Sequence, residues 1–289
     1  MPKFSLAVAT LGRDTELRRL FVSLKNQDYK DFEVIVVDQN KDNICKIIVE
    51  EFKNELDIKY FQVDFKAVAK ARDFGIKKAE GEIIAYPDDD CFYEKDVLSR
   101  VKAKFEDSAD LAIFSTASYC ILNPNRFSIG MNSPVLVPIT KTQLMGVEFT
   151  VFFNTNVIKR EDLYLDTDFG IGSKYKSTEG IEVLYRLISQ GYKGLYDPAV
   201  KIYHKSVIYY ESLDRFYRDA YGEGAFIRKF LNRGDVEILY YVLRKMIAAP
   251  LTKMAIAIVS FRGKAFIKGF NHFRGIWDGF FAYENTLHK

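Results

Sequence analysis

Strand and helix patterns alternate through the first part of the chain. Apolar runs rich in β-branched residues predict strands at 4–10, 33–38, 58–63 and 82–86. Between them, apolar residues recur every three to four positions, which predicts helices at about 15–26, 43–54 and 67–79. Continuous β-branched runs are typical of strands buried in a parallel sheet. The alternation therefore predicts an α/β fold, a Rossmann-like, mostly parallel sheet flanked by helices.

The pattern is weaker after residue 94. Residues 116–146 show little periodicity, which predicts a long connection, and long loops often bind ligands or act as lids. Other segments are assigned as follows: helix at 95–105, strand at 111–115, strand at 147–154, loop at 161–176, helix at 177–190 and strand at 195–204.

From Ser212 onward the sequence predicts only helices. Ser212 is a suitable N-cap for a helix that extends to about Asn232. Further helices are expected at 236–249, 251–261 and 265–283. Pro250 is expected to end or kink the helix at 236–249. We therefore expect an α/β domain over residues 1–210 and a helical C-terminal extension over residues 211–289.

Composition limits the class of protein. The chain has 289 residues and is 48% hydrophobic, enough for a sizeable core. Its cysteines, Cys45, Cys91 and Cys120, form no CxxC pair, so neither a disulfide framework nor a structural zinc site is expected. A strand begins at Phe4 with no secretory-signal pattern before it. We expect a cytoplasmic protein.

Three adjacent carboxylates, Asp88, Asp89 and Asp90, follow the apolar run at 82–86. In open α/β sheets ligands bind at the carboxyl ends of the strands. Adjacent carboxylates repel one another unless a cation offsets their charge. Oxygen ligands suit Mg²⁺ or Mn²⁺, ions that often bridge carboxylates and substrate phosphates. A metal–diphosphate site is one hypothesis; an acidic turn that caps a helix near Glu94 is the other.

Four motifs then occur in a recognisable order. They are Ala9-Thr10-Leu11-Gly12-Arg13, the segment 27–40, Ala71-Arg72-Asp73-Phe74-Gly75, and the segment 79–90 that ends in the three Asp. Together they resemble family 2 glycosyltransferases over roughly residues 4–210. The resemblance implies the GT-A fold and inverting transfer of a sugar from a nucleotide donor. The family usually has Asn where this chain has Asp73.

The resemblance also implies a donor site. Thr10 and Asp38 would bind the nucleoside, Asp88 would approach the ribose, and Asp90 with His204 would hold Mn²⁺ or Mg²⁺. The implied nucleotide-binding residues are Thr10, Arg13, Asp38, Arg72, Asp88 and Asp89.

Each of these residues also has a structural interpretation. Asp38 could cap the loop after its strand, Arg72 could be a solvated helix charge, and His204 could be structural. A Thr at the end of a strand, as at position 10, is ordinary.

The catalytic base is expected in the late helix. The family's Glu-Asp signature is replaced here by Glu179-Gly180, and Glu182 lies one helical turn further on. Glu179 and Glu182 are both candidates, and Glu179 is favoured because it is nearer the start of the helix. Both could instead be acids stabilised by the helix dipole. The chain would then be a degenerate, non-catalytic nucleotide-binding or scaffolding homologue.

The last fifth of the chain is basic. Residues 239–289 contain eight Lys or Arg and two acids, whereas the rest contains 34 basic and 37 acidic residues. Such helices could lie on an anionic membrane surface. They could instead pack on the catalytic domain or form a homodimer. No apolar run is long enough to span a bilayer, and no nucleic-acid-binding motif is present, so no nucleic acid is expected as a partner.

The combined prediction is a metal-dependent inverting glycosyltransferase acting in surface polysaccharide or glycolipid synthesis. Its donor is expected to be a nucleoside-diphosphate sugar, with UDP preferred and dTDP or GDP left open. Its acceptor is expected to be a sugar or a lipid-linked sugar, in the cytoplasm or at the inner face of the membrane. A sugar nucleotidyltransferase is an alternative, whereas a dehydrogenase is disfavoured because no GxGxxG follows the first strand.

Overall fold

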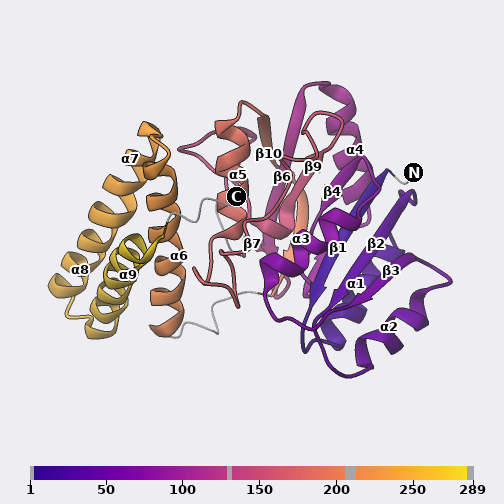
Figure 1. The fold of residues 1–289 in the computed structure, drawn as a ribbon, viewed down its shortest axis with the longest axis horizontal. Coiled ribbons are helices and arrows are strands. Elements are labelled where there is room, and N and C mark those ends of the chain that lie inside the picture. Colours follow the sequence, from indigo (N-terminus) through magenta and orange to yellow (C-terminus); the bar gives the residue numbers. More distant parts are fainter. Residues whose placement is uncertain (1–2, 129–131, 206–212, 285–289) are drawn as a thin grey trace. The chain divides into compact units, whose positions relative to one another are not determined.

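The computed structural model describes residues 3–128, 132–205 and 213–284, which divide into two compact units (Figure 1). The first, here the sheet unit, comprises Met1–Leu165 and Val183–Val207. The second, the helical unit, comprises Asp166–Glu182 and Ile208–Lys289. Residues 166–182 thus group with the C-terminal helices. The predicted division into domains 1–210 and 211–289 stays a prediction.

Among the described residues, ten strands form one sheet in the sheet unit. Eight of them follow the order β3-β2-β1-β4-β9-β6-β10-β5, while β7 pairs with β6 and β8 pairs with β10. The bounds are β1 Phe4–Thr10, β2 Phe32–Asp38, β3 Asp57–Gln62, β4 Ile83–Ala85, β5 Cys91–Tyr93, β6 Leu111–Cys120, β7 Asn123–Phe127, β8 Val137–Ile139, β9 Val151–Asn154 and β10 Lys193–His204.

Strand direction decides which residues meet at one edge. Strands β1 to β4 are parallel to their neighbours within that group, and β6 is parallel to β10. Strand β9 lies antiparallel between β4 and β6. The carboxyl ends of β1, β2, β4, β6 and β10 therefore lie along the same edge of the sheet. The predicted, mostly parallel α/β sheet is confirmed.

Helices flank this sheet, as Figure 1 shows for α1 to α4. Leu17, Leu20, Phe21 and Leu24 of α1 are all buried, as their spacing predicts. The bounds are α1 Thr15–Lys25, α2 Ile44–Phe52, α3 Val68–Lys78, α4 Val97–Asp107 and α5 Glu179–Ser189.

One prediction about the middle of the chain is wrong. Residues 116–146 are not one long connection, because β6 continues to Cys120 and the segment also contains β7 and β8. Most of β7 is exposed, so it lacks the alternation of apolar and polar residues that marks a half-buried strand. The helix expected at about 95–105 is present as α4, which begins at Val97 after the short strand β5.

The helical unit contains α6 Leu213–Asn232, a short 3-10 helix η3 at Val236–Ile238, α7 Leu239–Tyr241, α8 Ala249–Val259 and α9 Gly263–Ala282. A π-helix, η4 at Val242–Ala248, joins α7 to α8. Pro250 lies in the first turn of α8, directly after η4 ends at Ala248. A missing backbone N–H is tolerated at a helix start. The predicted N-cap Ser212 lies outside the described residues.

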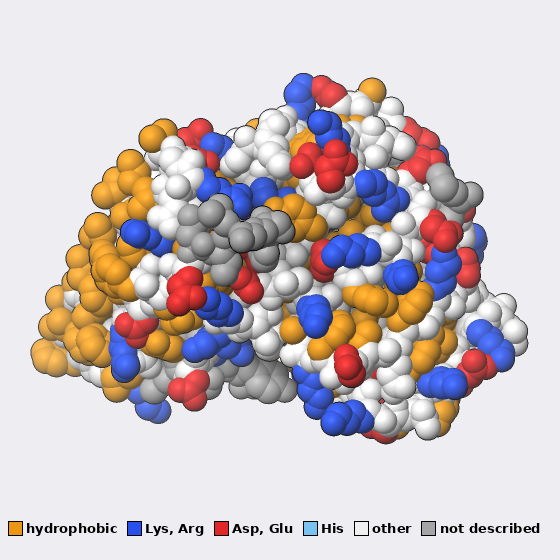
Figure 2. All heavy atoms as spheres, viewed as in Figure 1, with side chains coloured by type: hydrophobic (Ala, Val, Ile, Leu, Met, Phe, Trp, Pro, Cys, Tyr) orange, Lys and Arg blue, Asp and Glu red, His pale blue; other side chains and the backbone are white. Residues whose placement is uncertain are grey.

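Helices α6 and α9 pack with their backbones in close contact. A Cβ atom on Gly279 of α9 would lie 1.9 Å from the carbonyl oxygen of Tyr221 in α6, so only glycine fits there. Apolar side chains gather on the surface of this unit over α7 and α8 (Figure 2). In the described part of the chain, no helix has both the length and the apolar character needed to cross a membrane.

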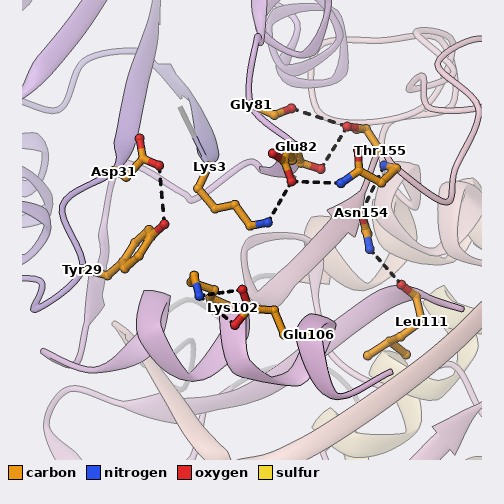
Figure 3. Close-up of polar contacts among 11 residues, drawn as sticks. Lys3, Tyr29, Asp31, Gly81, Glu82, Lys102, Glu106, Leu111, Asn154 and Thr155 are labelled. Atoms are coloured by element: carbon orange, nitrogen blue, oxygen red, sulfur yellow. Dashed lines mark hydrogen bonds and ion pairs between the residues drawn. The ribbon is translucent and has the colours of Figure 1, made fainter. Parts of the chain in front are cut away.

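Polar contacts join several strands at the edge of the sheet opposite the carboxyl ends (Figure 3). Lys3 pairs with Glu82 at 2.8 Å, and the Thr155 hydroxyl donates to the Glu82 carbonyl at 2.9 Å. Asn154 donates to the carbonyl of Leu111 at 3.3 Å. These contacts connect the segments before β1 and β4 with the end of β9 and the start of β6.

Glu33 of β2 is a buried charge near this edge. Its carboxylate accepts hydrogen bonds from the Ser5 hydroxyl and from the backbone N–H of Glu80, and it pairs with Lys59 at 2.7 Å. Burial alone would raise the pKa of Glu33, but the Lys59 and Ser5 contacts outweigh it and hold the pKa below its usual value. The carboxylate form is therefore favoured by folding.

We expect Glu33→Gln to lower the free energy of unfolding at pH 7 by about 1.5–3 kcal/mol, typical of hydrogen bonds to a charged group. Because the folded pKa is the lower one, the contribution of Glu33 is complete above its unfolded pKa. It is lost as pH falls through the folded pKa. Urea unfolding at several pH values would measure the difference between the two proteins. Glu55→Gln, at an exposed pair with Lys25, is the matched control. A pH-independent difference for Glu33→Gln would contradict this assignment.

Candidate functional site

The three predicted carboxylates lie at the carboxyl edge of the sheet. Asp88, Asp89 and Asp90 occupy the turn between β4 and β5. Strand β5 pairs antiparallel with β10, with Cys91 opposite His204. This pairing places the last residue of β10 beside the acidic turn. The Nε2 atom of His204 is 2.9 Å from Asp90 Oδ1 and 4.0 Å from Asp88 Oδ2.

Arginines from three parts of the sheet unit surround the same turn. Arg13, in the loop after β1, contacts Asp90 and lies 3.1 Å from Asp89 Oδ1. Arg72 of α3 pairs with Asp88 and lies over the ring of Tyr86, 5.4 Å from its centre. Arg19 of α1 donates to the backbone carbonyl of Asp90 at 2.9 Å. The mutual repulsion of the carboxylates is thus offset by cationic side chains of this chain. The alternative of Arg72 as a solvated charge is wrong, because its side chain is only 6% exposed.

The three Asp differ in their electrostatics. Burial raises the pKa of Asp89 to about 7, although the charge of Arg13 opposes this. Burial also acts to raise the pKa of Asp90, but the hydrogen bond and charge of His204, together with Arg13, hold it below the usual value. Burial would lower the pKa of His204, yet the neighbouring Asp90 and Asp88 raise it. The carboxylates of Asp90 and Asp88 thus favour the protonated form of His204.

The residues fit a divalent metal ion. One ligand atom each from Asp88, Asp90 and His204 lie within 4.8 Å of one another. Two carboxylates and an imidazole are suitable ligands for Mn²⁺. The Nδ1 atom of His204 lies 2.7 Å from the carbonyl of Lys205, and its ring stacks on Phe149 with centroids 4.8 Å apart. Both contacts fix the ring with Nε2 toward the carboxylates, as is usual for metal-binding histidines.

Thr10 and Asp38 end β1 and β2 and are directly paired in the sheet register. Asp38 Oδ1 accepts from the backbone N–H of Asn40 at 2.9 Å and from its amide at 2.7 Å, and the Tyr60 hydroxyl donates to Oδ2 at 2.7 Å. Asp38 does cap the loop after its strand. Its role toward a nucleoside stays a prediction.

The position where this chain departs from the family pattern has a structural role. Asp73 Oδ1 accepts from the backbone N–H of Leu165 at 3.0 Å, and Oδ2 pairs with Lys77 at 2.7 Å. Both contacts lie within the sheet unit, and the first connects α3 to the segment after β9. Each carboxylate oxygen of Asp73 therefore has a structural partner that holds the chain in place.

The two candidate bases lie in the helical unit. Glu182 is fully buried, and its Oε1 is 2.7 Å from Lys229 of α6. Lys229 also binds Asp166 at 2.6 Å, so one buried ammonium joins two carboxylates. Glu179 is the first residue of α5 and is 6% exposed. Both glutamates are buried and lie on the first turn of one helix.

The segment before Glu179 is strained. Lys176 and Thr178 have φ angles of 63° and 79°, in the left-handed region that non-glycine residues rarely adopt. The Ser177 hydroxyl donates to the Asp219 carbonyl of α6 at 3.0 Å. A Cβ on Gly222 of α6 would lie 2.2 Å from Ser177 Oγ, so α6 holds this turn at close range. Backbone strain that the surroundings enforce often marks a functional segment.

Sequence reasoning missed several residues around the site. Arg19 lies on α1 six positions after Arg13, and only the sheet reveals that both approach one turn. Phe149 lies in a 3-10 helix, η1 at Glu148–Thr150, that the sequence did not distinguish from a strand. Tyr60 lies on β3, and its contact with Asp38 depends on the pairing of β2 with β3. No local sequence signal identifies any of the three.

The family model for glycosyl transferase family 2 matches residues 5–163, more than half of the chain. The chain belongs to glycosyl transferase family 2. The matched region includes every predicted nucleotide-binding residue and Asp90, whereas Glu179, Glu182 and His204 lie beyond it.

Two curated proteins of this kind illustrate the similarity. The chain is 25% identical over 169 residues to the poly(ribitol-phosphate) β-N-acetylglucosaminyltransferase TarS of Staphylococcus aureus, over 57% of this chain and 30% of TarS. It is 37% identical over 93 residues to the GalNAc(5)-diNAcBac-PP-undecaprenol β-1,3-glucosyltransferase of Campylobacter jejuni, over 31% of this chain and 30% of that protein. The chain thus matches about a third of the length of each.

Solved structures share the fold. S. aureus TarS 1–349 in complex with UDP-GlcNAc superposes with a TM-score of 0.59 at 19% identity, covering 96% of this chain and 89% of that one. The mannosyltransferase PcManGT of Pyrobaculum calidifontis, in complex with GDP-Man and Mn²⁺, gives a TM-score of 0.68 at 14% identity, covering 98% and 88%. The predicted GT-A fold is confirmed.

We expect Lys229→Met to lower the free energy of unfolding by about 3–5 kcal/mol, because it leaves two buried carboxylates without their shared cation. Urea unfolding at pH 7 measures the loss. Lys174→Met removes an exposed pair with Glu284 in the same unit and should cost less than about 1 kcal/mol. If both substitutions lowered the free energy of unfolding equally, the contacts of Lys229 with Glu182 and Asp166 would not contribute as a buried ion cluster.

Proposed function

We propose that the chain is a metal-dependent inverting glycosyltransferase that moves a sugar from a nucleoside-diphosphate sugar to an acceptor hydroxyl. The observation that carries the proposal is the Asp88, Asp90 and His204 group, with its arginines, at the carboxyl edge of a GT-A sheet. This is the edge where ligands bind in open α/β folds. Family membership supplies the reaction class.

The residues of the sheet unit bind the donor in this proposal. Asp88, Asp90 and His204 hold Mn²⁺ or Mg²⁺, which when bound offsets negative charge on the leaving diphosphate. Arg13 and Arg72 turn from their carboxylate partners to diphosphate oxygens, since guanidinium groups bind both kinds of oxyanion. Thr10 and Asp38 bind the nucleoside, and Asp89 pairs with Arg13 until the donor is bound.

Glu179 is the general base in this proposal. It accepts the proton of the acceptor hydroxyl while that oxygen bonds to the anomeric carbon and the nucleoside diphosphate departs. Glu182 is less suited, because Lys229 already pairs with its buried carboxylate. The strained turn at Lys176 and Thr178, which directly precedes Glu179, supports the choice.

The names of similar proteins suggest which donor and which acceptor this chain uses. TarS structures contain UDP or UDP-GlcNAc, whereas PcManGT contains GDP-Man. We infer UDP as the donor nucleotide, because TarS is also similar in sequence. The relatives' names specify poly(ribitol-phosphate) and a PP-undecaprenol-linked sugar. We infer a polymer-linked or lipid-linked acceptor in surface polysaccharide or glycolipid synthesis.

A non-catalytic nucleotide-binding protein is the second candidate. It is favoured by Gly180, which stands where the family has the Asp of its Glu-Asp signature. Such a protein would bind the donor nucleotide without transferring the sugar.

A thermal-shift panel with UDP, dTDP and GDP, each with and without Mn²⁺, tests donor binding. We expect metal-dependent stabilisation by UDP. A ligand at about 100 times its Kd stabilises the folded state by roughly 2.7 kcal/mol. Asp90→Asn should abolish the effect of Mn²⁺, while Asp73→Asn, at a structural carboxylate, should retain it. No stabilisation by any of the nucleotides would refute the donor site.

Turnover of a UDP-sugar separates the two candidates for the base. Glu179→Gln should lower the rate about 100-fold or more and leave donor binding intact, as expected for loss of a general base. Glu182→Gln should instead lower stability, because it weakens the contact with Lys229. A rate unchanged in Glu179→Gln would exclude this residue. Donor binding by the unmodified chain without any turnover or donor hydrolysis would favour the non-catalytic candidate.

A further inference from the structure

Large apolar side chains are exposed along the C-terminal helices. We call the outer side of η4 and α8, with the turn into α9, the C-terminal apolar face. Figure 2 shows hydrophobic side chains gathered over these helices. Six apolar side chains of the C-terminal apolar face are at least half exposed: Leu243, Leu251, Ile256, Ile258, Val259 and Phe261. Contiguous exposed apolar surface of this kind marks an interaction site.

The turn between α8 and α9 is the most exposed part of this face. Phe261 is 97% exposed and Val259 is 78% exposed. Phe261 also has a φ angle of 52°, an unfavourable left-handed conformation for an aromatic residue. Helices α8 and α9 contact each other, so this turn forms the end of a helical hairpin. The side chain of Phe261 is therefore exposed to solvent in a backbone conformation that is energetically unfavourable for phenylalanine.

The charge of the surrounding segment indicates the partner. Seven Lys or Arg and no acid occur from Leu239 to Trp277. Lys245 pairs with Glu223 and Arg274 with Asp278, which leaves a net positive charge on the remainder. Arg262 and Lys264 are exposed directly beside Phe261. Two copies of this face would bring like charges together, whereas an anionic surface would complement them.

We propose that the C-terminal apolar face binds the surface of an anionic lipid bilayer, with Val259 and Phe261 inserted among the acyl chains. Arg262 and Lys264 lie at the headgroup level. Apolar residues of interfacial helices are buried roughly 5–10 Å into the boundary between headgroups and acyl chains. The face lies within the helical unit, so the binding does not depend on donor or on transferase activity.

Flotation of the full chain with vesicles tests the proposal. We expect binding to vesicles of phosphatidylcholine mixed with phosphatidylglycerol, and much weaker binding to phosphatidylcholine alone. Each surface Lys or Arg contributes about 1 kcal/mol to binding, or roughly fivefold in affinity. The double variant Arg262→Gln/Lys264→Gln should therefore bind about 25-fold more weakly. High salt should weaken binding of the unmodified chain, because it screens surface charge.

Matched controls separate this face from general charge and hydrophobicity. Lys46→Gln/Lys53→Gln removes two exposed charges at α2 and should leave vesicle binding unchanged. Phe261→Ser should weaken binding at least tenfold, whereas Leu122→Ser, at a 67% exposed residue of the sheet unit, should not. All four variants alter exposed side chains, and circular dichroism checks that each is folded.

A fluorescence experiment tests insertion directly. Trp277 is the only tryptophan of the chain, so Phe261→Trp in a Trp277→Phe background reports on the turn alone. Its emission should shift to shorter wavelength with anionic vesicles and be quenched by lipids with brominated acyl chains. Absence of vesicle binding by the unmodified chain would overturn the proposal. So would a dimer in sedimentation that Phe261→Ser dissociates while vesicles bind neither protein.

Discussion

The repulsion among three adjacent carboxylates is the constraint on which the sheet unit depends. Asp88, Asp89 and Asp90 lie together in one turn, and the last two are buried, where their charges could not be tolerated without cations. Arg13 and Arg72 supply two cationic partners, and the His204 ring lies against Asp90 as the third group. They come from the loop after β1, from α3 and from β10. The electrostatics of one turn therefore requires most of the sheet unit to be in place.

The same arrangement places groups that can bind a nucleotide-sugar donor at the acidic turn before the donor arrives. The arginines that offset the carboxylates are also groups that bind diphosphate oxygens. A metal ion would replace their charge at the carboxylates, because the two carboxylates and the imidazole are hard and borderline ligands suited to it. Metal binding requires the neutral imidazole of His204, so the affinity for the ion depends on pH. In the proposed function, donor binding moves the arginines from the carboxylates to the diphosphate, and the metal ion takes their place at the carboxylates.

Sequence reasoning succeeded where a signal is local. The burial of Leu17 and Leu24 follows from helical spacing, and the places of Thr10 and Asp38 follow from the rule that ligands gather at strand ends. It failed where the outcome depends on pairing across the chain. Strand β5 has three residues and no periodicity of its own, and it forms because β10 is available as a partner. The pair of Glu182 with Lys229 joins helices 47 positions apart, so no local pattern could predict it.

The pairing of β5 with β10 has a consequence for the order of assembly. Asp90 and His204 are neighbours only because Cys91 and His204 face each other across two antiparallel strands. During synthesis the acidic turn leaves the ribosome more than a hundred residues before the histidine that completes the cluster. Contacts of such long range form late in folding. An ion held by all three side chains would therefore bind only after β10 has joined the sheet beside β5.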